Sequence, residues 1–145
     1  MPSLLIGIAA ASGALFAGGA LYVTVVEHPA RLACGPPMAL AQFRKSYPRG
    51  AALQGSLAVV GGLAGAGAWL AGAAGGWALA GLVLFLVVPF TLVVIMPTNR
   101  RLLDPALGPD LPETRQLLAR WGLLHLARTA ASLCALALML RLLVS

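Results

Sequence analysis

Four apolar stretches of this chain are each long enough to cross a membrane as a helix. They run over about residues 4–26, 50–73, 77–96 and 121–144. A hydrocarbon core of about 30 Å takes about 20 helical residues to cross. None of the stretches alternates apolar with polar residues, so they predict helices and not the strands of a β-barrel. The sequence therefore predicts an all-α, integral membrane four-helix bundle that forms one domain over residues 1–145.

The composition excludes a soluble enzyme. Hydrophobic residues make up 60% of the 145 positions and charged residues only 10%, whereas a soluble domain carries about 25% charged residues. The net charge of +6 does not indicate a nucleic-acid partner, because no basic stripe with interleaved aromatic residues is present. Membrane lipids are the expected surroundings of the chain.

The basic residues predict the orientation of the bundle. Two stretches between apolar segments hold most of them: Arg31, Arg44, Lys45 and Arg49 in the first, and Arg100, Arg101, Arg115 and Arg120 in the second. With an even number of spans, both basic connections lie on the same side of the membrane. By the positive-inside rule that side is cytoplasmic, and both termini lie outside. We expect a multi-pass membrane protein, in a membrane that the sequence does not name.

Prolines and possible caps predict where the helices begin and end. Glu27-His28-Pro29 is expected to close the first helix, and Pro97 the third. Asp110 and Glu113 have the spacing of a capping box, which predicts that the fourth helix begins near residue 111. That helix then extends beyond the membrane on the basic side.

Small residues recur every four positions on two of the spans. Ala10, Ala14 and Gly18 form such a stripe on the first span, and Gly61 and Gly65 form one on the second. Stripes of this kind let helices approach closely in lipid. They predict packing within the four-helix bundle, with the contact face of a homo-oligomer as the alternative.

Polar side chains gather in the half of the bundle nearest the basic connections. Trp121, His125 and Arg128 are spaced by four and three residues, which places them on one helix face. Five further candidates for the site are Tyr22, Glu27, His28, Gln54 and Asn99. The opposite half of the bundle is almost wholly Leu, Ala, Gly and Val. This asymmetry predicts a polar pocket near the cytoplasmic interface, where a lipid-soluble substrate would meet protons.

Two further questions concern the partner of Arg128 and the role of the two histidines. Arg128 needs a partner at its depth, and Glu27 is the acid that adjoins a span on that side, so we expect an Arg128–Glu27 pair that is either structural or part of the site. His28 and His125 supply two imidazoles. No metal-ligand spacing accompanies them, and we expect no metal or haem.

Several motifs in their order along the chain resemble a known family. They are GALFAGGALYVTVVEHPARL, Tyr47-Pro48-Arg49-Gly50 with Gln54, Pro89-Phe90-Thr91 running to Pro97-Thr98-Asn99, and Trp121-Gly122-x-x-His125-x-x-Arg128-Thr129. The chain is similar to the small four-span integral membrane proteins that are grouped with the fungal anthrone oxygenases, many of which have a domain of unknown function. The resemblance implies a four-helix membrane bundle. In the polyketide branch of the family it implies oxidation of an anthrone to an anthraquinone by O₂ without an added cofactor.

The resemblance suggests a division of roles among the polar residues. His125 is the candidate base that removes a proton from a flat, lipid-soluble phenolic substrate, and Arg128 is the candidate that holds the resulting oxyanion. Asn99 or Gln54 would orient a carbonyl, and Tyr22 or Trp121 would form an aromatic wall. The Glu27-His28 pair also matches recurring polar positions of the family. The alternatives are a non-catalytic scaffold or lipid-binding bundle and, third, a transporter.

Overall fold

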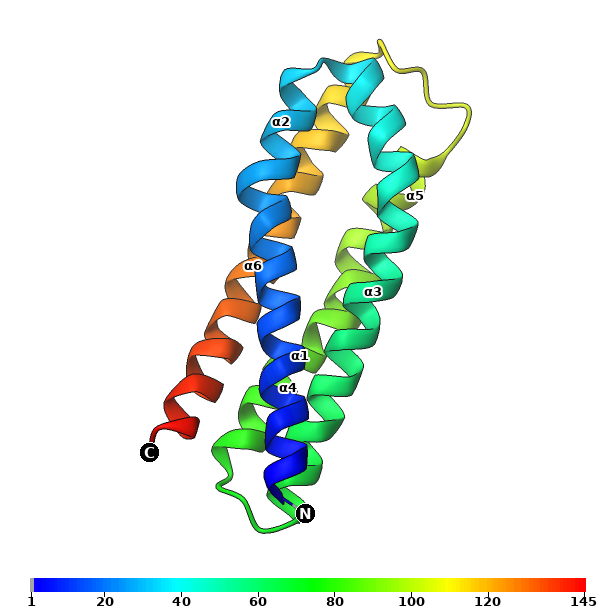
Figure 1. Ribbon diagram of the computed structural model, residues 1–145. Helices are drawn as coiled ribbons and strands as arrows, with labels where there is room; N and C mark the ends of the chain where they lie inside the picture. The colour runs from blue at the N-terminus through cyan, green and yellow to red at the C-terminus, as the bar shows by residue number, and fades with distance from the viewer. Residues whose placement is uncertain (1) are drawn as a thin grey trace.

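The computed structural model describes residues 2–145, which form four long helical arms (Figure 1). Each arm is long and apolar enough to cross a membrane: Pro2–Ala33, Pro36–Leu70, Gly76–Leu103 and Pro112–Leu143. The elements in order are α1 (Pro2–Tyr22), η1 (Val23–Glu27), α2 (His28–Ala33), α3 (Pro36–Leu70), α4 (Gly76–Phe90), η2 (Thr91–Ile95), α5 (Met96–Leu103) and α6 (Pro112–Leu143). The expectation of an all-α fold with four long apolar helices is confirmed. Met1, the first residue of the expected domain, lies outside the described residues.

The four arms alternate in direction, so the two long polar connections meet at one end of the bundle. The α2–α3 corner and the 104–111 connection lie at the top of Figure 1, and both termini lie at the bottom. Helix α3 packs against α1 and α4, and α6 packs against the same two helices. The basic stretches therefore share one end of the molecule, as the order of the segments predicts.

Two prolines that were expected to end helices lie inside continuous arms. The first arm passes Pro29 and ends at Ala33, and the third passes Pro97 and ends at Leu103. In both, a five-residue π-helical turn comes just before the proline: η1 ends at Glu27 and η2 at Ile95. A π turn shifts the backbone hydrogen bonds by one residue, and a proline has no N–H that must be paired. The predicted ends at residues 27–29 and at Pro97 are therefore wrong.

The first basic stretch is helical and not a loop. Helix α3 begins at Pro36, continues through Pro48 and spans 35 residues, about 50 Å at 1.5 Å per residue. The expected start of the second span near residue 50 is only the point where its apolar part begins. Within this extension Arg44 donates to the carbonyl oxygens of Leu102, Asp104 and Leu107. Arg44 thus fastens the 104–111 connection to α3.

The last helix begins at Pro112, as predicted, but without the expected capping box. Leu111 occupies the N-cap position and no side chain caps the helix. Glu113 instead pairs with Arg101, with 2.7 Å between Oε1 and Nε, and Arg101 also contacts Asp104 at 2.8 Å. The backbone N–H of Ala106, together with Arg101, lowers the pKa of the Asp104 carboxyl. The carboxylates of Asp104 and Glu113 both pair with Arg101, and these contacts hold the 104–111 connection and the start of α6 against α5.

The two small-residue stripes have different surroundings. On α3, Gly61 and Gly65 are buried, and a Cβ added at Gly65 would lie 2.6 Å from the carbonyl oxygen of Trp77 at the start of α4. On α1, Ala14 and Gly18 are exposed, and nothing lies within 4 Å of a Cβ added at Gly18. The stripe on the second span packs the bundle as predicted. On the first span Ala10 packs against the core, whereas Ala14 and Gly18 do not.

Candidate functional site

His125 lies at the centre of a buried hydrogen-bonded cluster between α6 and the π turn η1. Its Nδ1 is 3.1 Å from Thr24 Oγ1 and 3.4 Å from Thr129 Oγ1, and the two hydroxyl oxygens are 2.9 Å apart. The π turn carries Thr24, and Thr129 follows His125 by one helical turn. The π turn therefore helps to build the surroundings of His125.

The hydrogens of the two threonine hydroxyls are coupled to the tautomer of His125. Thr24 Oγ1 donates to the carbonyl oxygen of Ala20 at 2.9 Å, and Thr129 Oγ1 donates to the carbonyl oxygen of His125 at 2.9 Å. Each hydroxyl has a single hydrogen. When both hydrogens are used on these carbonyl oxygens, His125 Nδ1 donates to Thr24 and the lone pair of a neutral imidazole is on Nε2. When Thr129 instead donates to Thr24, Thr24 donates to Nδ1 and Nε2 carries the proton.

Arg128, one turn further into the bundle, has no acidic partner among residues 2–145. It is 9% exposed, its Nη2 donates to Gln54 Oε1, and its guanidinium carbon lies 5.1 Å from the centre of the Phe16 ring. Its Nε is buried without a hydrogen-bond partner. A neutral amide and an aromatic face solvate the cation only in part, so Arg128 is a buried and uncompensated positive charge.

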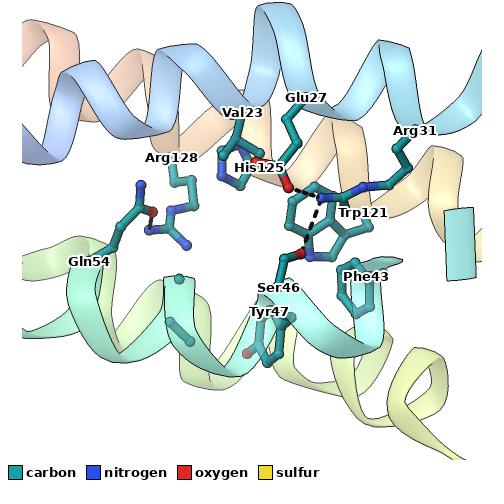
Figure 2. Close-up of a pocket in the computed structure, with 12 residues that line it drawn as sticks. Val23, Glu27, Arg31, Phe43, Ser46, Tyr47, Gln54, Trp121, His125 and Arg128 are labelled. Atoms are coloured by element: carbon teal, nitrogen blue, oxygen red, sulfur yellow. Dashed lines mark hydrogen bonds and ion pairs between the residues drawn. The ribbon is translucent and has the colours of Figure 1, made fainter. Parts of the chain in front are cut away.

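The expected Arg128–Glu27 pair is wrong, because Glu27 has other partners. Its Oε1 accepts from Arg31 Nη2, one turn later on α2, and from Gln42 Nε2 on α3 at 2.7 Å. Since the first arm continues as a helix beyond Glu27, it brings Arg31 within reach of that carboxylate. Arg31 also faces Ser46 across the site (Figure 2).

Aromatic rings form one wall of the site around Trp121. The centre of the Trp121 ring lies 4.7 Å from that of His125, 5.1 Å from that of His28 and 5.2 Å from that of Phe43. Phe43 in turn stacks on Tyr47, with 5.2 Å between ring centres. This arrangement holds the His125 imidazole between Trp121 and the two threonine hydroxyls.

A small cavity lies between these groups and is shown in Figure 2. It has a volume of about 90 Å³ and joins the aromatic wall to the buried arginines. It is lined by Val23, Glu27, Arg31, Phe43, Ser46, Tyr47, Gly50, Ala51, Gln54, Trp121, His125 and Arg128. Gln54 and Arg128 also line a second cavity, of about 130 Å³, between α3 and α4.

The structure brings together five of the eight candidate residues and leaves three outside the cavity. Trp121, His125, Arg128, Gln54 and Glu27 line it. Tyr22 is 57% exposed and lines a different, outward-facing pocket. His28 is buried behind Trp121, and Asn99 is buried behind Tyr47, whose hydroxyl oxygen accepts from Asn99 Nδ2 at 2.7 Å.

Several polar and aromatic residues of the site were not candidates in the sequence. They are Thr24, Arg31, Phe43, Ser46, Tyr47 and Thr129. Phe43, Tyr47 and Gln54 are spaced by four and seven residues, which is a helical period. That spacing predicts a shared helix face only where the segment before residue 50 is helical, whereas the sequence favours a loop there. Thr24 and Arg31 carried no comparable signal.

Among residues 2–145, no three His, Cys, Asp or Glu side chains come together in a group that could hold a metal ion. The arrangement combines an imidazole, a buried arginine and an aromatic wall. Chemically, such a set can accept a proton and stabilise a negatively charged oxygen on the molecule that loses it.

A family model described as anthrone oxygenase matches residues 43–138, more than half of the 145-residue chain. The chain belongs to the anthrone oxygenase family. The matched region holds Phe43, Tyr47, Gln54, His125 and Arg128, so most of the cavity lies within the part shared with this family. A search of curated proteins finds no match to the chain, and a search of solved structures finds none either. The resemblance read from the sequence motifs is thus confirmed.

Proposed function

We propose that this protein is a membrane-embedded oxygenase that oxidises a flat, lipid-soluble phenolic substrate of the anthrone type with O₂ and no added cofactor. The observation that carries the proposal is the pairing of His125 and Arg128 on one cavity. The hydroxyls of Thr24 and Thr129 engage Nδ1, and in the tautomer that is protonated there Nε2 is left as a base beside an uncompensated cation. Membership of the anthrone oxygenase family supports the same chemistry.

In the proposed reaction His125 Nε2 accepts the acidic proton of the substrate. The electron pair is then shared between the substrate oxygen, which Arg128 stabilises, and the ring carbon opposite it. That carbon reduces O₂ and forms a C–O bond, and the returning proton gives a hydroperoxide. Loss of water, with the remaining hydrogen of that carbon, leaves a carbonyl. One atom of O₂ enters the quinone and the other leaves as water.

The neighbouring residues have supporting roles in this proposal. Gln54 holds Arg128 and can donate its amide N–H to a substrate carbonyl, and Trp121 is the wall for the ring system. Glu27 keeps Arg31 in place at the polar end of the cavity. His28 and Asn99 act as positioning residues, because they contact Trp121 and Tyr47 from behind.

We further propose that the four arms cross the membrane as one domain, with the basic end in the cytoplasm and both termini outside. Four arms of sufficient length and apolar character support the crossing. The concentration of arginine and lysine at one end supports the orientation. In this arrangement membrane lipids surround the apolar surface, and the substrate reaches the site from lipid.

The two native cysteines test this orientation. Both are free and exposed, Cys34 at the α2–α3 corner and Cys134 in the middle of α6. A membrane-impermeant maleimide is expected to label Cys34 in inside-out vesicles and not in right-side-out vesicles. Cys134 is expected to stay unlabelled in both, because lipid covers it. Labelling of Cys34 from the outside would reverse the orientation, and labelling of Cys134 would contradict the fourth span.

Oxygen uptake tests the proposed activity. We expect purified protein in nanodiscs to consume O₂ with anthrone above the rate of autoxidation in empty nanodiscs, with one quinone formed per O₂. Arg128→Gln is expected to lower this rate by about 100-fold or more, in the range found when one oxyanion donor is removed. Arg120→Gln, at an exposed position of the same helix, is the matched control and should keep the wild-type rate.

If the protein consumed no O₂ above autoxidation with anthrone and related phenols, the proposed oxygenase activity would be contradicted. If Arg128→Gln then changed thermal stability alone, the polar cluster would be structural, as in a scaffold or lipid-binding bundle. Circular dichroism of each variant separates a lost rate from a lost fold.

A further inference from the structure

The Glu27–Arg31 pair lies between the polar cavity and a second pocket on the outside of the bundle. This outward-facing pocket has a volume of about 290 Å³ and lies between the first arm and the start of α3. Tyr22 and Cys34 both line it and are both exposed. Because Cys34 lies at the α2–α3 corner, the pocket extends to the polar end of the bundle.

Glu27 and Arg31 are the two residues that line both spaces. The side chain of Arg31 is 3% exposed, whereas that of Glu27 is 25% exposed and so reaches the surface. The hydrogen bonds from Arg31 and Gln42 both end on Glu27 Oε1. Glu27 Oε2 accepts from no side chain among residues 2–145 and is not an enclosed atom. It is therefore open to water and free to take up a proton.

The polar cavity between Glu27 and His125 suits a short chain of water molecules. Its volume of about 90 Å³ has room for about three waters at their liquid volume of about 30 Å³ each. A water in a cavity needs two to four polar partners. Glu27, Ser46 and His125 supply them together with the two arginines that line the same space (Figure 2).

We propose that Glu27 is a proton-transfer residue that connects His125 with water at the polar end of the bundle. The protonated imidazole gives its proton from Nε2 to the first water of the cavity, and the last water gives a proton to Glu27 Oε2. Glu27 then releases a proton to water in the outward-facing pocket. Each step breaks one bond to hydrogen and forms another, so His125 becomes neutral and one proton leaves the site.

This inference rests on the proposed function, in which His125 takes a proton from the substrate. The path in reverse supplies the proton that later gives the hydroperoxide. It also predicts exchange between His125 and water in the absence of any substrate, and that exchange can be measured by itself.

Exchange of the His125 ring proton with water tests the inference without turnover. The chain has two histidines, of which His125 lines the cavity, whereas His28 is buried behind Trp121 and does not line it. In protein labelled with ¹⁵N-histidine in nanodiscs, solid-state NMR is expected to show faster magnetisation transfer from water to the ring of His125 than to that of His28. The second histidine is thus an internal reference.

Three substitutions assign the path to the carboxylate. Glu27→Gln keeps an oxygen that accepts from Arg31 but loses the carboxylate, and should slow exchange of the His125 ring proton by about 100-fold, the lower end of the effect of a positioned proton-transfer group. Glu27→Asp keeps a carboxylate and should recover most of the exchange. Glu113→Gln is the matched control, because it removes an acidic partner of Arg101 at the same end but outside the cavity.

A second readout separates proton transfer from a structural role. With anthrone in D₂O and no O₂, the wild type is expected to place deuterium on the substrate faster than empty nanodiscs do, and Glu27→Gln is expected to lose this exchange. With O₂ present, oxygen uptake by Glu27→Gln should fall much less, because His125 can return the proton that it took. A structural defect would lower both rates by the same factor.

Two outcomes would overturn the inference. One is transfer from water to His125 that is no faster than to His28, which would mean a dry cavity and is measured in the wild type alone. The other is unchanged exchange of the His125 ring proton in Glu27→Gln. Absence of oxygen uptake and of substrate deuteration, with exchange at His125 that still depends on Glu27, would instead overturn the proposed oxygenase and leave the proton path standing.

Discussion

Exchange of His125 for glutamine is expected to lower the rate of oxygen uptake with anthrone by about 100- to 10,000-fold, the usual contribution of a general base. Glutamine has a similar reach and can still hydrogen-bond to Thr24, but it has no nitrogen that accepts a proton at neutral pH. Steady-state oxygen consumption at saturating substrate measures the change.

The threonine hydroxyls supply the control for this result. Thr24→Val removes the acceptor of the Nδ1 proton and should reduce the rate, whereas Thr24→Ser keeps a hydroxyl and should restore most of it. This rescue distinguishes the positioning of the imidazole from a general loss of packing. A His125→Gln variant that folds and turns over like the wild type would remove His125 from the mechanism.

Composition and segment length were sufficient to predict the four helical arms. Apolar residues over about 20 positions leave few structures in which the backbone groups are paired, so the spans follow from the residues alone. The shared face of Trp121, His125 and Arg128 follows as directly, because a helix repeats every 3.6 residues. These three residues line the cavity together in the structure.

The partners of those residues depend on features that single positions do not reveal. A proline usually ends a helix, but at Pro29 and Pro97 the preceding π turn lets the helix continue. The continued first arm places Arg31 beside Glu27, and so takes from Arg128 the acid that was expected to neutralise it. The uncompensated charge of Arg128 thus results from how the backbone is continued and not from residue type.

The small-residue stripes also show that a local pattern does not reveal which helix face is buried. The stripe that is buried, on α3, predicts a large effect on stability. Gly65→Ala is expected to destabilise the bundle by at least about 2 kcal/mol relative to Gly18→Ala. Both substitutions bring the same gain in helix propensity, about 1 kcal/mol, so the difference between them reports packing alone. At Gly65 the new Cβ would lie 2.6 Å from Trp77 O and 3.0 Å from Gly81 Cα, and both are backbone atoms that move only with α4.

Thermal unfolding of the two variants in the same detergent measures this difference, and its sign also reports on assembly. Gly18→Ala is expected to be neutral or slightly stabilising, because the exposed stripe of α1 has open space at Gly18. A loss of stability in Gly18→Ala as large as in Gly65→Ala would mean that the α1 stripe packs against something absent from the single chain. A second copy of the protein would be the first candidate, since small residues on an exposed membrane helix suit close approach of two helices.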